Sequence, residues 1–181
     1  MESKLFTPVT FGPLTLRNRT IRSAAFESMC PGNAPSDMLL DYHRSVAAGG
    51  IGMTTVAYAA VTQSGLSFDR QLWMRPEIIP GLRRLTDAIH AEGAAAGIQL
   101  GHCGNMSHKS ICGCMPVGAS SGFNLYSPTF VRGLRADELP EMARAYGRSV
   151  NLAREAGFDS VEIHAGHGYL ISQFLSPSTN H

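Results

Sequence analysis

The feature of this sequence that most constrains its fold is an alternation of short apolar runs with longer amphipathic segments. Three of the amphipathic segments end in glycine, at Gly49–Gly50, Gly93 and Gly157, and an apolar run follows each of them. Glycine adopts the left-handed conformation that ends many helices, so each glycine predicts a helix end before a strand. We therefore expect strand–helix units that form a parallel sheet with right-handed crossovers.

Periodicity defines the expected elements. Residues 9–18 alternate apolar and polar side chains around Gly12–Pro13, which predicts a short N-terminal hairpin. The expected strands cover residues 20–26, 51–61, 94–101 and 158–166. The expected helices cover residues 35–50, 78–93 and 137–157, the last with Asp137 as its N-cap. Residues 102–136 are expected to be a long loop, and no helix is expected after the fourth strand.

Composition narrows the class of protein. The chain has 181 residues, 44% hydrophobic and 16% charged, which suits one globular domain with a sizeable core. The net charge of +1 gives no reason to expect a nucleic-acid or membrane partner. The four cysteines are too few for a disulfide scaffold, and the N-terminus lacks the apolar core of a secretory signal. We therefore expect a cytoplasmic protein with reduced thiols.

Polar side chains near the strand ends favour a barrel over an open doubly wound sheet. Gln99 lies between two aliphatic residues of the third strand, and Glu162 and His164 alternate with aliphatic residues in the fourth. Polar groups at the carboxyl ends of strands suit the mouth of a β/α barrel. The first strand–helix link also lacks the G-x-G-x-x-G pattern of a dinucleotide site. The chain is thus expected to be α/β, the first half of a TIM (β/α)8 barrel with about four βα units. Residues 1–181 would form the N-terminal part of one domain, interrupted after strand 4.

The segment EIHAGHGYLISQFLSP, residues 162–177, carries the candidate chemistry. Neutral imidazoles at His164 and His167 can each donate an N–H to a carbonyl oxygen, and such donors stabilise developing negative charge. The phenol of Tyr169 stays protonated at neutral pH and can deliver a proton. Two other interpretations of the histidines remain: a pair that satisfies backbone carbonyls in the core, or a zinc site, for which the spacing is poor.

The sequence resembles the Old Yellow Enzyme-like NADH:flavin oxidoreductases. The resemblance rests on LFTPVTFGPLTLRNR (residues 5–19), GIQLGH (97–102) and AGFDSVEIHAGHGYLISQFLSPSTNH (156–181). It implies an FMN-dependent oxidoreductase in which NADH or NADPH reduces the flavin. The reduced flavin then passes a hydride to the C=C bond of an enone or enoyl thioester. It also implies that His164 and His167 bind the substrate carbonyl and that Tyr169 donates the proton.

The resemblance assigns flavin contacts as well. Gln99 is expected to bind the pyrimidine edge of the flavin, since an amide both donates and accepts. The remaining cofactor-binding positions that the resemblance implies are Ser23, Ala24, Ala25, Ala60 and His164. Some relatives carry an iron–sulfur cluster in a C-terminal region, and a homo-oligomer is possible for the full-length protein.

Other functions stay open on the sequence alone. One is an incomplete fragment that is inactive by itself and binds FMN poorly. Another is a metal-dependent barrel lyase or hydrolase that uses Glu162 with the two histidines. The segment His102–Cys114 also gathers two histidines and three cysteines, which could bind a metal, or Cys103 could be an oxidisable thiol. We assign no metal site.

Overall fold

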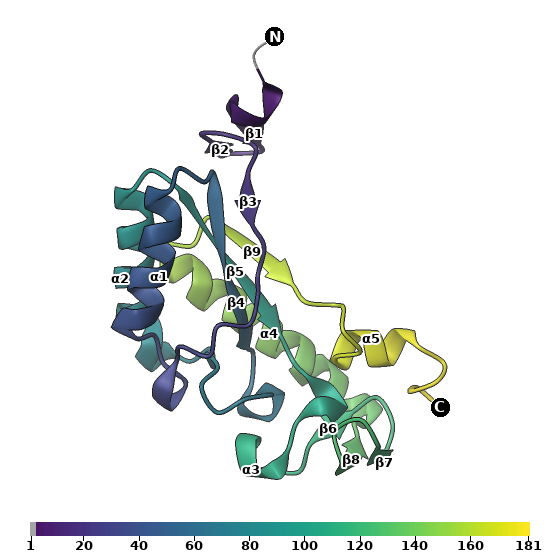
Figure 1. Cartoon of the computed structure of the whole chain (residues 1–181). Helices are drawn as coiled ribbons and strands as arrows, with labels where there is room; N and C mark the ends of the chain where they lie inside the picture. The colour runs from purple at the N-terminus through teal and green to yellow at the C-terminus, as the bar shows by residue number, and fades with distance from the viewer. Residues whose placement is uncertain (1–2) are drawn as a thin grey trace.

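The computed structural model describes residues 3–181 and opens with the expected hairpin. Strands β1 (Val9–Phe11) and β2 (Leu14–Leu16) pair antiparallel, with Val9 opposite Leu16. Gly12 occupies the turn with φ +55°, a conformation that glycine adopts without steric cost. The hairpin projects from one end of the molecule, next to the N-terminus (Figure 1).

The main sheet has four parallel strands in chain order, β3-β4-β5-β9. They are β3 (Ile21–Arg22), β4 (Met53–Ala60), β5 (Ala95–Gly101) and β9 (Ser160–Ile163). A doubly wound sheet reverses its strand order at a switch point, whereas this sheet advances in one direction as a β/α barrel does. The parallel sheet of four units is therefore confirmed. The four strands do not close into a barrel, and β3 and β9 are the edge strands of the sheet.

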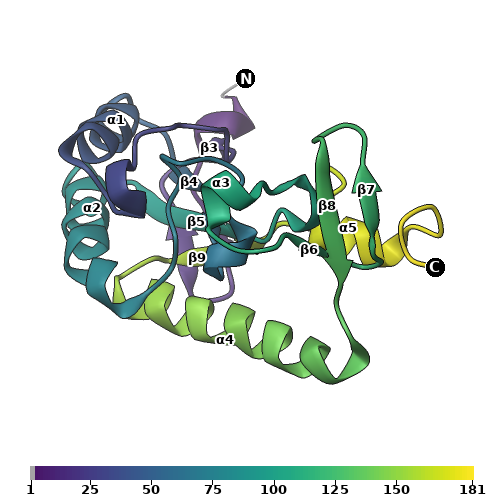
Figure 2. The same cartoon turned by 90° about the horizontal axis from the view of Figure 1, so that it is seen from below.

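Three helices cover one face of this sheet. They are α1 (Asp37–Ala48), α2 (Ile79–Ala91) and α4 (Leu139–Glu155), and Figure 2 shows them side by side around its outer face. The Ser36 hydroxyl begins α1 by accepting a hydrogen bond from the Leu39 amide at 3.2 Å. The core lies between helices and sheet and includes Leu39, Leu82, Ile98 and Leu100, all 0% exposed.

The start of α4 differs from the expectation. Asp137 is not the N-cap, because it lies within a 3₁₀ turn, Ala136–Glu138, and its carboxylate pairs with Arg135. Glu138 occupies the position before the helix and accepts a hydrogen bond from the Arg135 amide at 2.8 Å. The 3₁₀ turn thus takes up the residues that the sequence pattern assigned to the first turn of the helix.

The expected long loop of residues 102–136 contains regular structure. It holds α3 (Lys109–Cys112), β6 (Val117–Gly118), β7 (Gly122–Asn124) and β8 (Thr129–Gly133). Strand β8 pairs antiparallel with β7 and parallel with β6, so the three strands form a small second sheet. This sheet lies beside α5 (Leu170–Leu175), a short helix after the fourth strand, so the prediction that no helix follows this strand is wrong (Figure 2). No helix within residues 3–181 is long and apolar enough to cross a membrane.

Candidate active site

A cavity of about 320 Å³ opens between strands β4 and β5 and the segments that follow β3, β4 and β9. Ala24 and Ala25 line it from the segment after β3, and Gln99 from the end of β5. His164, His167 and Tyr169 line it from the segment after β9. The carboxyl ends of parallel strands meet at one edge of the sheet, which explains how residues so distant in sequence share one cavity.

The two histidines contact each other at the wall of this cavity. Nδ1 of His167 lies 3.0 Å from Nε2 of His164, and Nδ1 of His164 accepts a hydrogen bond from the Gly166 amide at 3.4 Å. This arrangement places the ring proton of His164 on Nε2 and that of His167 on its own Nε2. Burial, and then the proximity of the His167 imidazole, lower the pKa of His164, so this imidazole is neutral at pH 7.

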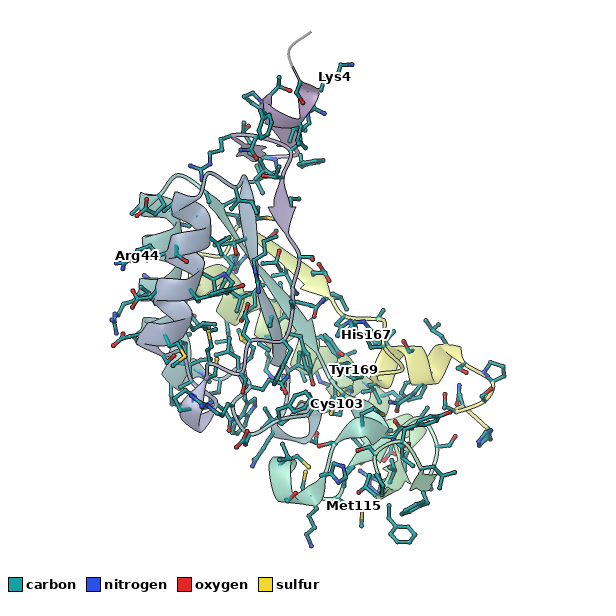
Figure 3. All side chains as sticks on the ribbon, in the orientation of Figure 1. Lys4, Arg44, Cys103, Met115, His167 and Tyr169 are labelled. Carbon is teal, nitrogen blue, oxygen red and sulfur yellow. The ribbon has the colours of Figure 1, made fainter. Side chains whose placement is uncertain are left out.

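Tyr169 completes a cluster of rings with the histidines, and Figure 3 shows His167 and Tyr169 close together beside the start of α5. The Tyr169 ring centroid lies 5.0 Å from that of His164 and 6.1 Å from that of His167. Burial raises the pKa of Tyr169 above its ordinary value, so its phenol is protonated throughout the neutral range. The structure therefore brings the three residues of the sequence motif to one place.

Tyr58 belongs to the same cluster, although it lies in no motif of the sequence. Its ring lies 5.4 Å from Tyr169 and 5.8 Å from His164. The pairing of β4 with β5 shifts between Val56 and Ala59, so Ala57 and Tyr58 form a bulge. Such a bulge redirects side chains, and here both bulged residues line the cavity. A register shift leaves no mark in hydrophobic periodicity, so no pattern in the sequence predicts this bulge.

Gln99 is held by the neighbouring strand. It is paired in register with Glu162, and its side-chain Nε2 donates a hydrogen bond to Oε1 of that residue at 2.5 Å. The carboxylate thus fixes which way the amide faces. An oriented amide at the cavity wall can both donate to and accept from a planar heterocycle.

The other predicted flavin-binding residues do not all line the cavity. Ala24 and Ala25 line the cavity, whereas the exposed Ser23 and the fully buried Ala60 are not among its lining residues. Ala60 packs instead against Leu66 and Cys112. The roles of Ser23 and Ala60 stay predictions from the resemblance.

A buried ionic network fixes the segment after β3. The Glu27 carboxylate lies 2.9 Å from Nη1 of Arg22 and 3.0 Å from Nε2 of His43, and it accepts from the Ala57 amide at 3.3 Å. Nδ1 of the buried His43 lies 2.8 Å from the Thr54 hydroxyl. Because Glu27 takes a backbone amide of β4, the expected strand 20–26 shortens to Ile21–Arg22.

Aromatic side chains form the outer wall of the cavity. Phe26 and Phe68 line it with their ring centroids 4.3 Å apart, and they are 62% and 44% exposed. Neither residue belongs to a motif, and only the folded chain brings them together. They add apolar surface to a cavity that polar side chains also line.

The histidines and cysteines after β5 do not form a metal centre. Within residues 3–181, no three His, Cys, Asp or Glu side chains are grouped closely enough to hold a metal ion. His108 bonds to Ser127 at 2.5 Å, and the buried Cys103 thiol donates to the Leu66 carbonyl at 3.4 Å. The metal-dependent alternative with Glu162 gains no support from this geometry.

A parallel sheet wound in chain order beneath one helical layer, with its polar side chains at the strand ends, defines part of a β/α-barrel protein. The chain belongs to the NADH:flavin oxidoreductase / NADH oxidase family, whose family model matches residues 4–181. This confirms the family that the sequence motifs indicated.

Curated relatives agree with this family. The chain is 43% identical over 176 residues to the 4,4'-dithiodibutanoate disulfide reductase of Rhodococcus erythropolis, covering 97% of this chain and 44% of that protein. It is 35% identical over 186 residues to an NADPH dehydrogenase of Bacillus subtilis, covering 100% of this chain and 54% of that protein. The chain therefore spans about half the length of the curated relatives it matches.

Solved structures show the same partial match. An old yellow enzyme homologue from Zymomonas mobilis superposes with a TM-score of 0.91 at 28% identity, covering 99% of this chain and 53% of that one. Morphinone reductase in complex with tetrahydroNAD gives a TM-score of 0.90 at 27% identity, covering 99% of this chain and 54% of that one. The four βα units thus correspond to about half of an Old Yellow Enzyme barrel.

Proposed function

We propose that the protein is an FMN-dependent NAD(P)H oxidoreductase that reduces the C=C bond of α,β-unsaturated carbonyl compounds. The observation that carries the proposal is the convergence of His164, His167 and Tyr169 on the cavity that Gln99 also lines. The family match and the relatives named NADPH dehydrogenase support a nicotinamide donor. NADH and NADPH are both kept as candidates.

The residues of the cavity suit a flavin ring. Ala24, Ala25 and Ala57 present small side chains that permit a planar ring to approach closely, and Gln99 offers an oriented amide for its pyrimidine edge. Gly101 lets Tyr58 and His164 pack closely against β5, because a Cβ there would lie 2.8 Å from Cδ2 of Tyr58 and 3.2 Å from Cβ of His164. Bound FMN would supply the hydride for the alkene carbon remote from the carbonyl.

His164 and His167 bind and polarise the substrate carbonyl in this proposal. The His167 Nε2–H can donate outward, because Nδ1 of the same ring faces His164. The His164 Nε2–H becomes a second donor when the carbonyl oxygen replaces His167 as its acceptor. A donor aimed at developing negative charge contributes about 3 kcal/mol to transition-state stabilisation. The lowered pKa of His164 keeps it an uncharged donor at neutral pH.

Tyr169 supplies the proton that completes the reduction. Its phenol lies in the ring cluster beside His164, and burial raises its pKa, so the proton is in place when the enolate forms. The proton goes to the carbon next to the carbonyl, and the product is the saturated carbonyl compound. A general acid of this kind contributes about 10²–10⁴-fold to the rate.

A second candidate substrate is an organic disulfide. It is favoured by the relative from Rhodococcus erythropolis, which is named a disulfide reductase and is 43% identical. The same two electrons from NAD(P)H would convert one disulfide into two thiols. This reaction does not require a proton from Tyr169 to carbon.

Reoxidation of the reduced protein separates the two candidates. FMN-loaded protein is reduced anaerobically with one equivalent of NADPH or NADH and mixed with 2-cyclohexenone or with 4,4'-dithiodibutanoate. We expect the enone to restore the oxidised flavin spectrum and to yield cyclohexanone. If only the disulfide restores it, ene reduction is wrong and the second candidate replaces it.

The environment of the protein also remains a proposal. Cys30, Cys103, Cys112 and Cys114 are all free thiols, which supports the predicted cytoplasmic location. The iron–sulfur cluster that some relatives carry, and a homo-oligomer, stay predictions from the resemblance.

A further inference from the structure

A turn at the end of α3 brings two thiols together. Sγ of Cys112 lies 3.6 Å from Sγ of Cys114. Gly113 between them has φ +71°, and its amide closes the helix on the Lys109 carbonyl at 2.8 Å. The left-handed glycine reverses the chain, so the two cysteine side chains face each other across the turn.

The two thiols have different surroundings. Cys112 is 0% exposed and packs with Ala60 and Leu66, while its thiol donates to the Cys114 carbonyl at 3.2 Å. Cys114 is exposed to solvent. An exposed thiol can reach an external disulfide, and a buried thiol at contact distance can then displace the bound group.

We propose that Cys112 and Cys114 form a redox-active dithiol that takes an organic disulfide as its oxidant and closes to an intramolecular disulfide. The Cys114 thiolate attacks one sulfur of the oxidant, so an S–S bond to Cys114 forms and the first thiol leaves. The Cys112 thiolate then attacks Sγ of Cys114, and the second thiol leaves. Two protons and two electrons pass from the cysteines to the oxidant, which becomes two thiols.

The local geometry permits this closure. An S–S bond is about 2.05 Å long, so the two sulfurs must approach by roughly 1.5 Å. Gly113 absorbs such a movement more easily than any other residue, because it has no Cβ. The other two cysteines, Cys30 and Cys103, are 4% and 0% exposed and do not compete for an external oxidant.

The test of this proposal is run at pH 9, because the Cys114 thiol loses its proton only at high pH. Partial burial, followed by the contact with the Cys112 thiol, raises the pKa of Cys114 to about 11. The thiolate is the reacting form, so the exchange rate should rise with pH up to that value.

The test uses protein whose cysteines are reduced and whose bound FMN is oxidised. It is mixed, without nicotinamide, with the aromatic disulfide 5,5'-dithiobis(2-nitrobenzoate). We expect two equivalents of nitrothiobenzoate per chain, and a peptide containing residues 112–114 that has lost two hydrogen atoms. Cys112→Ser should release one equivalent and keep the mixed disulfide on Cys114. Cys114→Ser should react at least tenfold more slowly than the wild type at this site.

Peptide mapping of the wild type keeps the test decisive if either variant fails to fold. A wild-type chain that keeps a nitrothiobenzoate adduct on Cys114 overturns the proposal, because the buried thiol then fails to displace it. An unmodified peptide at residues 112–114 overturns it as well. The proposal does not depend on ene reduction, since nicotinamide is absent and the stoichiometry is counted per chain.

Discussion

Buried His102 shows how a single residue couples folding to pH. It is 0% exposed, its Nδ1 accepts from the Gly104 amide at 3.0 Å, and its Nε2 lies 3.1 Å from the Ser64 hydroxyl. Burial lowers its pKa to about 4. The folded state therefore resists protonation, whereas the unfolded chain takes up a proton near pH 6.5. The resulting stability is present above pH 6.5 and is lost as the pH falls toward 4.

The His102→Gln variant tests this coupling. Wild-type protein should lose about 2–3 kcal/mol of unfolding free energy at this site between pH 7 and pH 4.5. The variant lacks the titrating group, so its loss over the same interval should be smaller by that amount, as measured by urea unfolding. His90→Gln is the control, because His90 is partly exposed and pairs with Asp159 at the surface. Equal pH dependence in the wild type and His102→Gln would contradict the assignment.

Helix α5 positions the segment that carries His164, His167 and Tyr169 through one buried side chain. Gln173 is 2% exposed, and its Nε2 donates to the Gly168 carbonyl at 2.7 Å and lies 3.2 Å from the Cys103 carbonyl. Its Oε1 accepts from the Asn105 amide at 3.1 Å. Gly168 stands between His167 and Tyr169, so this glutamine joins the ring cluster to the loop after β5.

Gln173→Met should weaken this connection while conserving side-chain volume. Buried carbonyl and amide groups lose their partners, which costs about 1–3 kcal/mol of unfolding free energy. Gln63→Met, at an exposed glutamine, should change it by less than about 0.5 kcal/mol. Denaturant unfolding of both variants measures the difference. Similar stabilities would mean that Gln173 does not hold the segment.

The elements differ in how well the sequence predicted them. Periodicity and the glycine stops predict helices α1, α2 and α4 and the parallel strands, because the buried face of each element sets the spacing of its apolar residues. Strand β3 was predicted too long because the Glu27 side chain replaces a backbone partner, a tertiary contact that no local pattern records. The small second sheet was missed because β6 and β7 have only two and three residues, too few to show a period.

The candidate site shows the same division. His164, His167 and Tyr169 lie close together in the sequence, so a motif predicts them, and the structure places them around one cavity. Tyr58 and the Phe26–Phe68 wall come from a bulge and from loops distant in the chain. Their positions depend on long-range packing, which one sequence without its fold does not reveal.

At the scale of the whole molecule, the main sheet ends at an apolar edge beside β9. Strand β9 is an edge, and Ile163 on it is 44% exposed. A groove of about 440 Å³ lies beside it. Its lining residues are Leu139, Met142, Ala143, Tyr146, Ile163, Leu170, Ile171 and Phe174. An unpaired edge next to an apolar groove is a template for association.

We therefore expect residues 1–181, expressed alone, to self-associate with increasing concentration. Ile163→Lys places a charge on the edge and should raise the concentration for half-association by at least about tenfold. Met38→Lys is the control, because Met38 is 58% exposed on α1 and away from the groove. Sedimentation velocity over a concentration series measures the effect. A wild-type chain that stays monomeric at all concentrations would contradict the expectation.

The measurement that tests the central claim most directly is the pair of half-reaction rates of Tyr169→Phe in the FMN-loaded protein. The account predicts that reoxidation by 2-cyclohexenone slows by about 10²–10⁴-fold, because no proton reaches the enolate carbon. Reduction by NAD(P)H should stay near the wild-type rate, and Tyr126→Phe, at a 95% exposed phenol, should change neither rate. Reoxidation of Tyr169→Phe at the wild-type rate, or equal slowing of both half-reactions, would contradict the account.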